Sequence, residues 1–146
     1  MSVIHSSYEV NLKWEHNRKG TLSSPVLPQK IEVATPPDFP KGMPGIWSPE
    51  HLFVAAVNGC LMTTFLAIAE NSKLEYINFE CSATGVVDKV EGKYQVTEIT
   101  LNPVLTITAS GNVERAKRIL EMSEKNCLVS NSMKTIIHLL PQIIIN

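Results

Sequence analysis

The feature that most constrains this fold is an uncharged, largely apolar run of 18 residues at positions 52–69. Such a run is long enough to cross a membrane as a helix. However, it contains an asparagine, a glycine and two threonines, and acids (Glu50 and Glu70) flank it in place of the Lys and Arg asymmetry of a membrane helix. We therefore predict a buried core helix, with a membrane span as the less favoured alternative.

The residues before this run predict where the helix begins. Ser48 can cap it, Pro49 suits the first helical position, and Glu50 complements the positive end of the helix dipole. The run has no polar stripe, and a lone chain of 146 residues could hardly cover every side of it. The pattern therefore favours a homodimer with this helix at its centre.

The rest of the chain has the periodicities of strands and of one amphipathic helix, which predicts an α+β fold. Five prolines and two glycines at positions 36–49 indicate a long loop. The apolar phase slips between Val96 and Ile99, which predicts a β-bulge, and Asn112 is placed to cap the second helix. The predicted elements are strands at 8–14, 21–27, 29–35, 76–88 and 94–108, turns at 16–20 and 91–92, helices at 48–72 and 112–126, and a last strand with a short helical lead-in at 135–145.

Composition excludes several classes of protein. Apolar residues make up 44% of the chain and charged residues 18%, which excludes a disordered chain. Thirteen basic and fourteen acidic residues give a net charge of −1 without a basic stripe, which argues against a nucleic-acid partner. The opening MSVIHSSYEV has no basic segment followed by an apolar one, so we expect no secretion signal.

The three cysteines, an odd number at wide spacing, do not make a secreted disulfide framework, which indicates a cytoplasmic protein. No C-x-x-C and no His pair at i, i+4 occurs, so no metal site is expected. Cys60 lies mid-helix, where core packing is the simplest role, and Cys81 alternates in a strand as a structural residue would. Cys127 lies at a helix end among polar residues, where a thiol can be partly exposed and can have a lowered pKa if it also meets a helix N-terminus.

Two cysteine-containing segments resemble those of a known family. Residues 48–60, SPEHLFVAAVNGC, resemble the signature that runs from (N/S)-P-E to a cysteine in the OsmC/Ohr family, the osmotically induced and organic hydroperoxide resistance proteins. Residues 114–133 resemble the family's second cysteine segment, usually C-P-V-S, with Leu128 in place of the proline. Residues 18–24, RKGTLSS, resemble its arginine-containing loop, and the order of predicted elements matches along nearly the whole chain.

The resemblance implies a thiol-dependent peroxidase that reduces organic hydroperoxides. Cys60 would be the peroxidatic nucleophile and Cys127 the resolving cysteine. Arg18 would hold the Cys60 thiolate and donate to the peroxide, and Glu50 would orient that arginine, with Lys19 as the alternative to Arg18 if the alignment shifts. The reductant would be a dithiol, typically on a lipoylated protein, and no cofactor is implied.

The resemblance also implies the fold. We expect a single OsmC-like domain over residues 1–146, with N-terminal strands and the proline-rich loop at 1–47, the central helix at 48–72, and the remaining elements at 73–146. Antiparallel sheets would surround the long buried helix in an intertwined homodimer. Glu50 and Cys60 are ten residues apart on one helix, about 15 Å along its axis and on different faces. One protomer's Glu50 would therefore serve the other protomer's Cys60.

Two alternatives stay open. The chain could be an OsmC-like protein with weak or no peroxidase activity and another thiol-based role, or a stress protein that binds a small molecule or lipid. A group of apolar residues could either line a substrate entrance or seal the dimer interface. These residues are Trp14, Phe39, Met43, Ile46 and Trp47.

Overall fold

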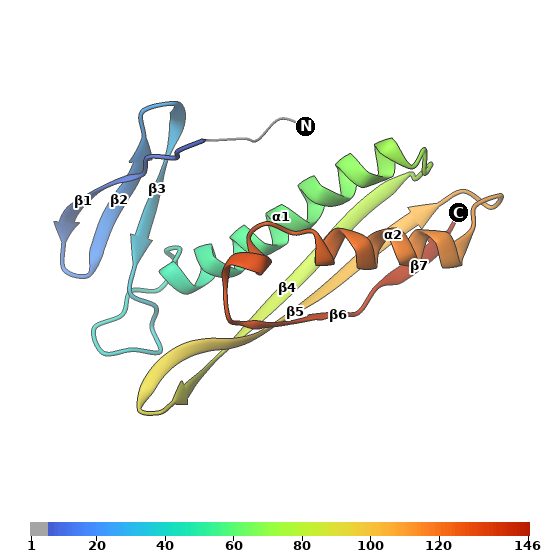
Figure 1. The fold of residues 1–146 in the computed structure, drawn as a ribbon. Helices are drawn as coiled ribbons and strands as arrows, with labels where there is room; N and C mark the ends of the chain where they lie inside the picture. Colours follow the sequence, from blue (N-terminus) through green and yellow to red (C-terminus); the bar gives the residue numbers. More distant parts are fainter. Residues whose placement is uncertain (1–5) are drawn as a thin grey trace. The chain divides into compact units, whose positions relative to one another are not determined.

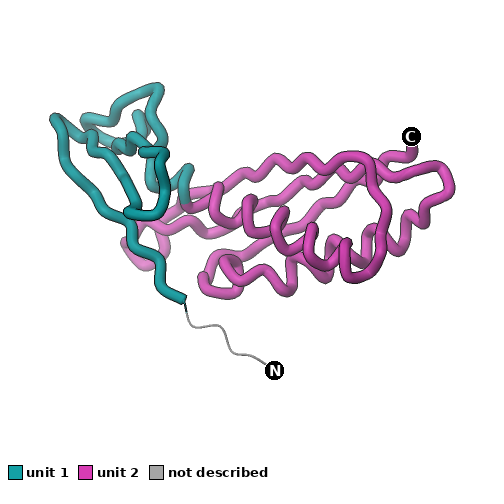
Figure 2. The backbone as a smooth tube through the Cα atoms, turned by 90° about the horizontal axis from the view of Figure 1, so that it is seen from above, with its two compact units in different colours: residues 1–52 teal, residues 53–146 magenta. Residues whose placement is uncertain are grey.

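The computed structural model describes residues 6–146, and its contacts group the chain into two compact units, Met1–Leu52 and Phe53–Asn146 (Figure 2). Residues 1–5, which include His5 and half of the segment considered above for a secretion signal, lie outside the described residues. The single domain expected over residues 1–146 stays a prediction.

The first unit contains a three-stranded antiparallel sheet in the order β1 (Asn11–His16), β2 (Lys19–Ser24) and β3 (Leu27–Ala34). The predicted turn before β2 is confirmed, and its Asn17 has a positive φ of 48°. The second turn lies at residues 25–26, earlier than predicted, so β3 includes Pro28. The first strand also begins later than predicted, and all of its residues are exposed in the single chain. The face of β1 that the alternation predicts to be buried is therefore exposed in the single chain.

The proline-rich segment forms a long loop, as predicted. Between β3 and the first helix, the described backbone is irregular apart from an isolated bridge between Val33 and Trp47. Met43 N–H donates to Thr35 carbonyl oxygen at 2.8 Å and closes the loop on itself. A Cβ at Gly42 would lie 2.0 Å from the Pro36 carbonyl oxygen, so this crossing requires glycine.

Helix α1 (Pro49–Asn71) has the start that the sequence predicts. The Ser48 hydroxyl oxygen accepts the N–H of His51 at 3.1 Å, which satisfies one of the free donors of the first turn. By length and composition α1 could also cross a membrane, a criterion that core helices of soluble proteins meet as well.

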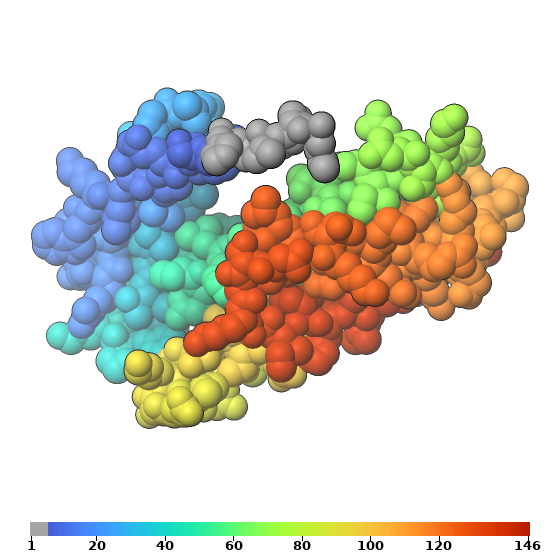
Figure 3. All heavy atoms as spheres, viewed as in Figure 1, coloured from blue at the N-terminus to red at the C-terminus, as the bar shows by residue number. Residues whose placement is uncertain are grey.

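Only one row of α1 is buried in the single chain, and other parts of the helix lie at the molecular surface (Figure 3). That row consists of Val57, Leu61, Phe65 and Ala69. The other sides carry apolar side chains at the surface, such as Met62 and Leu66. The sequence argument that one protomer cannot cover this helix therefore agrees with the structure.

The second unit is built on a long hairpin, β4 (Asn78–Val90) and β5 (Lys93–Ile107), which lies along α1 (Figure 1). The tight turn at Glu91 and Gly92 has positive φ at both residues, as hairpin turns of two residues require. The predicted bulge is confirmed, because the pairing slips between Val86 and Val87 and leaves Thr97 without a counterpart. A Cβ at Gly85 would lie 2.6 Å from the Val54 side chain, so this glycine permits the close packing of α1 on β4.

Helix α2 (Val113–Lys125) packs on the same face of the sheet as α1. The Asn112 side chain accepts the N–H of Arg115 at 3.0 Å, which confirms the predicted cap. The core between the helices and the sheet joins Phe65 of α1, Leu105 of β5 and Leu120 of α2. Burial of such side chains contributes about 1.5–3 kcal/mol each, so this layer carries much of the unit's stability.

The end of the chain differs from the prediction of one last strand. A 3-10 turn, η1 (Ser130–Ser132), leads into two short strands, β6 (Ile136–Leu139) and β7 (Gln142–Ile145). Both run parallel to β5 in one register, and the break between them falls at Pro141, directly across from Pro103 of β5. Neither proline can donate to the ladder, which explains the interruption. The sheet is mixed because β6 and β7 run parallel to β5, whereas β4 runs antiparallel to it.

Candidate active site

Cys60 lies on the fourth turn of α1 and is half-buried. Its sulfur lies 3.8 Å from the Thr64 hydroxyl oxygen, because residues four apart share one face of a helix. The sequence therefore contains a signal for Thr64 as part of the site, although the sequence analysis above does not use it.

Cys127 follows α2 directly and is 1% exposed. Its N–H donates to the Glu124 carbonyl oxygen at 3.1 Å, and its carbonyl oxygen accepts the Ser130 hydroxyl at 3.2 Å. These bonds fix the cysteine at the point where the chain leaves α2. Cys127 is therefore not partly exposed, as a cysteine at a helix end can be, and Ser130 of the following loop contacts its thiol.

The structure brings the Cys60 and Cys127 thiols together as a hydrogen-bonded pair of free cysteines. Helices α1 and α2 pack side by side on one face of the sheet, and this packing accounts for the contact between residues 67 positions apart. The two sulfurs also receive different neighbours. The backbone N–H groups of Leu128 and Val129 are directed at Cys60.

The two thiols differ in acidity because burial and hydrogen bonds act differently on them. Burial raises the pKa of Cys60, but hydrogen bonds from the Cys127 thiol, the Val129 N–H, the Thr64 hydroxyl and the Leu128 N–H outweigh it, and the pKa falls below its usual value. Burial raises the pKa of Cys127, and its hydrogen bond to Cys60 raises it further. The lowered pKa therefore belongs to Cys60, and the pKa of Cys127 is raised.

Cys81 lies on β4 and behaves differently from this pair. Burial raises its pKa to about 11, partly offset by a hydrogen bond from the backbone of Asn102. At neutral pH this thiol stays protonated. A low-reactivity, structural role is consistent with that environment.

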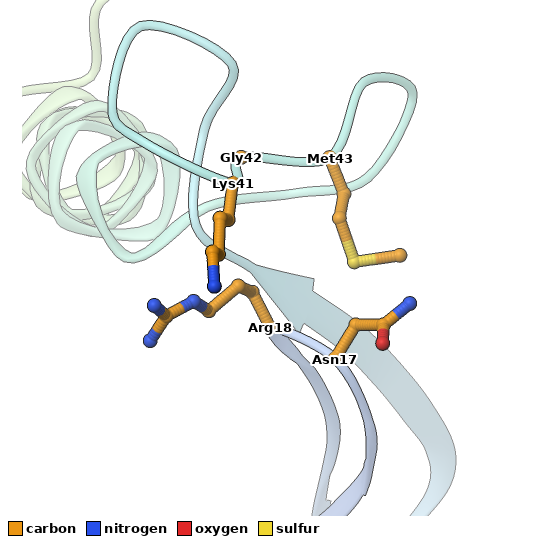
Figure 4. A pocket seen from close by; sticks show the side chains of 5 residues that line it. All are labelled: Asn17, Arg18, Lys41, Gly42 and Met43. Carbon is orange, nitrogen blue, oxygen red and sulfur yellow. The ribbon is translucent and has the colours of Figure 1, made fainter.

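Arg18 lies in the turn between β1 and β2, in the first unit. Together with Asn17, Lys41, Gly42 and Met43 it lines an open cavity of about 530 Å³. Figure 4 shows the ends of the Arg18 and Lys41 side chains approaching each other, with Asn17 and Met43 on the other side of the opening. The cavity is therefore positively charged on one side.

Lys19, the alternative to Arg18, is already paired. Its ammonium group forms ion pairs with Glu32 on β3 and, at 3.9 Å, with Glu15 on β1. The hydrogen bond with Glu32 raises the pKa of Lys19. This pairing across the sheet favours Arg18 over Lys19 as the available cation.

Glu50 lies in the first turn of α1 and is half-buried. Within residues 6–146 of the single chain, the ion pairs do not include Arg18 or Glu50. The structure thus brings the two cysteines together, but within residues 6–146 it forms no ion pair between Arg18 and Glu50. Of the five apolar residues considered for a substrate entrance, Met43 lines the cavity beside Arg18.

Comparison with known proteins identifies the class to which this fold and cysteine pair belong. A family model described as OsmC-like protein matches residues 42–139, so the chain belongs to the OsmC-like family. Its fold is the OsmC-like α+β fold, with one row of α1 packed in the core.

Three relatives illustrate the likeness. An OsmC-like protein of unknown function from Vibrio cholerae has a TM-score of 0.83 at 23% identity, over 94% of this chain and 99% of that one. An organic hydroperoxide resistance protein from Elizabethkingia anophelis has a TM-score of 0.76 at 19% identity, over 98% of this chain and 100% of that one. The uncharacterised protein YmaD of Bacillus subtilis is 22% identical over 138 residues, which cover 92% of this chain and 89% of YmaD. At these identities the two solved structures establish the shared fold.

Proposed function

We propose that this protein is a redox stress protein and, more specifically, a thiol-dependent peroxidase that reduces organic hydroperoxides to alcohols. The observation that carries the proposal is the asymmetry of the paired thiols. Cys60 is half-buried and has a lowered pKa, whereas Cys127 is fully buried beside it and has a raised pKa. A peroxidatic cysteine must be a thiolate, and a resolving cysteine must wait as a thiol within reach. Membership of the OsmC-like family and the name of the Elizabethkingia relative support the same assignment.

The proposed reaction has two chemical steps in the protein. The Cys60 thiolate attacks the terminal oxygen of the hydroperoxide, the O–O bond breaks, and the leaving alkoxide takes a proton to become the alcohol. The Cys60 sulfenic acid that results is attacked by the Cys127 sulfur. A disulfide forms, and the hydroxyl leaves as water with the Cys127 proton.

A dithiol reductant then restores the pair by thiol–disulfide exchange. Two thiols are oxidised for each hydroperoxide reduced, so the external dithiol supplies both electrons. A lipoylated protein is the proposed reductant, and the reducing cytoplasm is the proposed location, because free cysteines persist there. No cofactor or metal takes part in this proposal.

Arg18 and Glu50 have proposed roles in the same reaction. Arg18 donates to the peroxide oxygen and balances the thiolate charge, since a guanidinium stays protonated at any relevant pH. Glu50 orients this arginine. The pairing of Lys19 with Glu32 supports the choice of Arg18.

We also propose that the working unit is a homodimer that shares its two sites. The exposed side of α1 supports this proposal, because small or apolar residues lie along it at helical spacing. These residues are Ala55, Ala56, Gly59, Met62, Leu66 and Ala67. Leu66→Glu should therefore shift the sedimentation mass toward the monomer, whereas Thr84→Glu, on the exposed strand β4, should not. A native protein that sediments at 16.2 kDa would contradict the dimer.

The experiment that tests the activity is a thiol count and intact mass after one equivalent of cumene hydroperoxide, and separately of hydrogen peroxide. We expect two thiols and about two mass units to be lost within seconds, faster with the organic peroxide. Three unreactive thiols would contradict the peroxidase and favour the alternative of a small-molecule or lipid-binding protein with the same fold.

A further inference from the structure

The loop that follows Cys127 is held by its own hydrogen bonds. The Cys127 carbonyl oxygen accepts the Ser130 hydroxyl at 3.2 Å and the Asn131 N–H at 3.0 Å. The Leu128 carbonyl oxygen accepts the Ser132 hydroxyl at 2.8 Å. The loop therefore turns both carbonyl groups inward, toward its own residues.

This arrangement fixes where the next two N–H groups point. In a trans peptide the N–H lies opposite the carbonyl of the preceding residue. The N–H of Leu128 thus points away from the partners of the Cys127 carbonyl, and the N–H of Val129 away from the partner of the Leu128 carbonyl. Hydrogen bonding from both N–H groups lowers the pKa of Cys60.

Leu128 contributes to this loop through its backbone. Its side chain is 73% exposed, so packing does not explain a large apolar residue here. A proline, which the C-P-V-S pattern has at this position, carries no N–H and could not donate. This chain therefore has two consecutive donors where that pattern leaves one.

We propose that the consecutive N–H groups of Leu128 and Val129 form a backbone donor pair that holds the Cys60 thiolate, and that Leu128 supplies a donor which proline cannot. Consecutive N–H groups directed at one point favour an anion there. The Thr64 hydroxyl, at 3.8 Å, and the Cys127 thiol complete the set around the sulfur. This inference deepens the proposed function and rests on it for its catalytic meaning.

The test is the pH profile of Cys60 alkylation by iodoacetamide in the native protein, with the labelled cysteine identified by peptide mass spectrometry. Leu128→Pro removes one donor, so the Cys60 pKa should rise. Alkylation at pH 7 should fall about threefold to tenfold, which corresponds to about half a pKa unit to one unit. Leu128→Ala keeps the N–H and removes only the exposed side chain, so it should leave the profile unchanged. Identical profiles for the proline variant and the native protein would overturn the proposal.

A second substitution keeps the test decisive if the proline variant does not fold. Proline restricts the preceding residue, here Cys127, to extended conformations, so circular dichroism and thermal melting must accompany the profile. Replacement of Leu128 by leucic acid, which makes the 127–128 linkage an ester, removes the N–H and keeps the side chain. It should raise the Cys60 pKa in the same direction, and an unchanged pKa in the folded ester variant would overturn the proposal.

Failure of the proposed function gives a different result. Alkylation requires a thiolate and no peroxide, so the donor pair can be measured in a protein without peroxidase activity. A shifted Cys60 profile in a protein that does not consume cumene hydroperoxide supports the donor pair and contradicts the peroxidase. An unshifted profile in an active enzyme contradicts the donor pair alone.

Discussion

The cysteine pair and the Arg18 turn differ in their polar contacts within the single chain. Cys60 receives donors from Cys127, from Thr64 and from the loop after α2. Arg18 is exposed in a β-turn, and the ion pairs of residues 6–146 do not include it or Glu50. All of the contacts that lower the Cys60 pKa come from residues within Phe53–Asn146.

This difference separates two requirements of peroxide reduction. The thiolate can be stabilised by neutral donors, whereas charge that develops on the peroxide oxygens calls for a cation or another strong donor. The comparison therefore predicts that variants of the cysteine region change thiol chemistry itself. Variants of the Arg18 region should change the reaction with peroxide more than the thiol.

The largest effect is expected for Cys60→Ser, which removes the proposed nucleophile. Consumption of cumene hydroperoxide with a dithiol should fall to the background rate. Cys81→Ser is the matched control and should retain activity, because a thiol with a pKa of about 11 is a thiolate in only about one molecule per thousand at pH 8. A Cys60→Ser protein that still consumes peroxide would show that another residue is the nucleophile.

Cys127→Ser should come next, because it would stop the proposed catalytic cycle after the first chemical step. The Cys60 sulfenic acid then has no neighbouring thiol, and a second peroxide oxidises it to the sulfinic acid. Intact mass should rise by about 16 and then about 32 mass units as peroxide is added. Sustained turnover of this variant with a dithiol would show that the reductant resolves Cys60 directly.

Arg18→Ala sharpens the comparison between the two regions. Loss of a charged donor is expected to lower the peroxide rate about tenfold to a hundredfold, since a hydrogen bond to a charged group contributes about 1.5–3 kcal/mol. Alkylation of Cys60 at the same pH should fall much less. Lys19→Ala is the control and should affect stability rather than rate, because Lys19 pairs with Glu32. Equal losses in the peroxide and alkylation rates would contradict the separation of the two regions.

The sequence predicts much of this fold because local signals are strong. Ser48 and Asn112 cap their helices, and Glu91 with Gly92 turns the hairpin. The two strands at the end of the chain are harder to predict. Pro141 divides them because it lies opposite Pro103 of β5, and this pairing is remote in sequence. The exposed β1 illustrates the same limit, because alternation predicts an apolar face without specifying what covers it.

The candidate site could be predicted only in part. Motif resemblance selects Cys60 and Cys127, but their contact depends on how α1 and α2 pack. The polarity of the pair, with the lowered pKa at Cys60, depends on backbone N–H groups that no side-chain pattern encodes. The choice between Arg18 and Lys19 depends on an ion pair across two strands, which becomes visible only when β2 and β3 are in register.

Thr64→Val should have the smallest effect and tests whether a single weak donor in the cysteine region is measurable. The hydroxyl lies 3.8 Å from the Cys60 sulfur, a long contact, and valine keeps the shape of the side chain without the donor. Because the hydroxyl stabilises the thiolate, its loss should raise the Cys60 pKa. Alkylation below that pKa should slow about twofold. The profiles of the native protein and the variant should converge at high pH, where Cys60 is ionised in both. A loss that persists at high pH would mean that Thr64 positions the sulfur instead of stabilising its charge, and it would assign Thr64 to the architecture of α1.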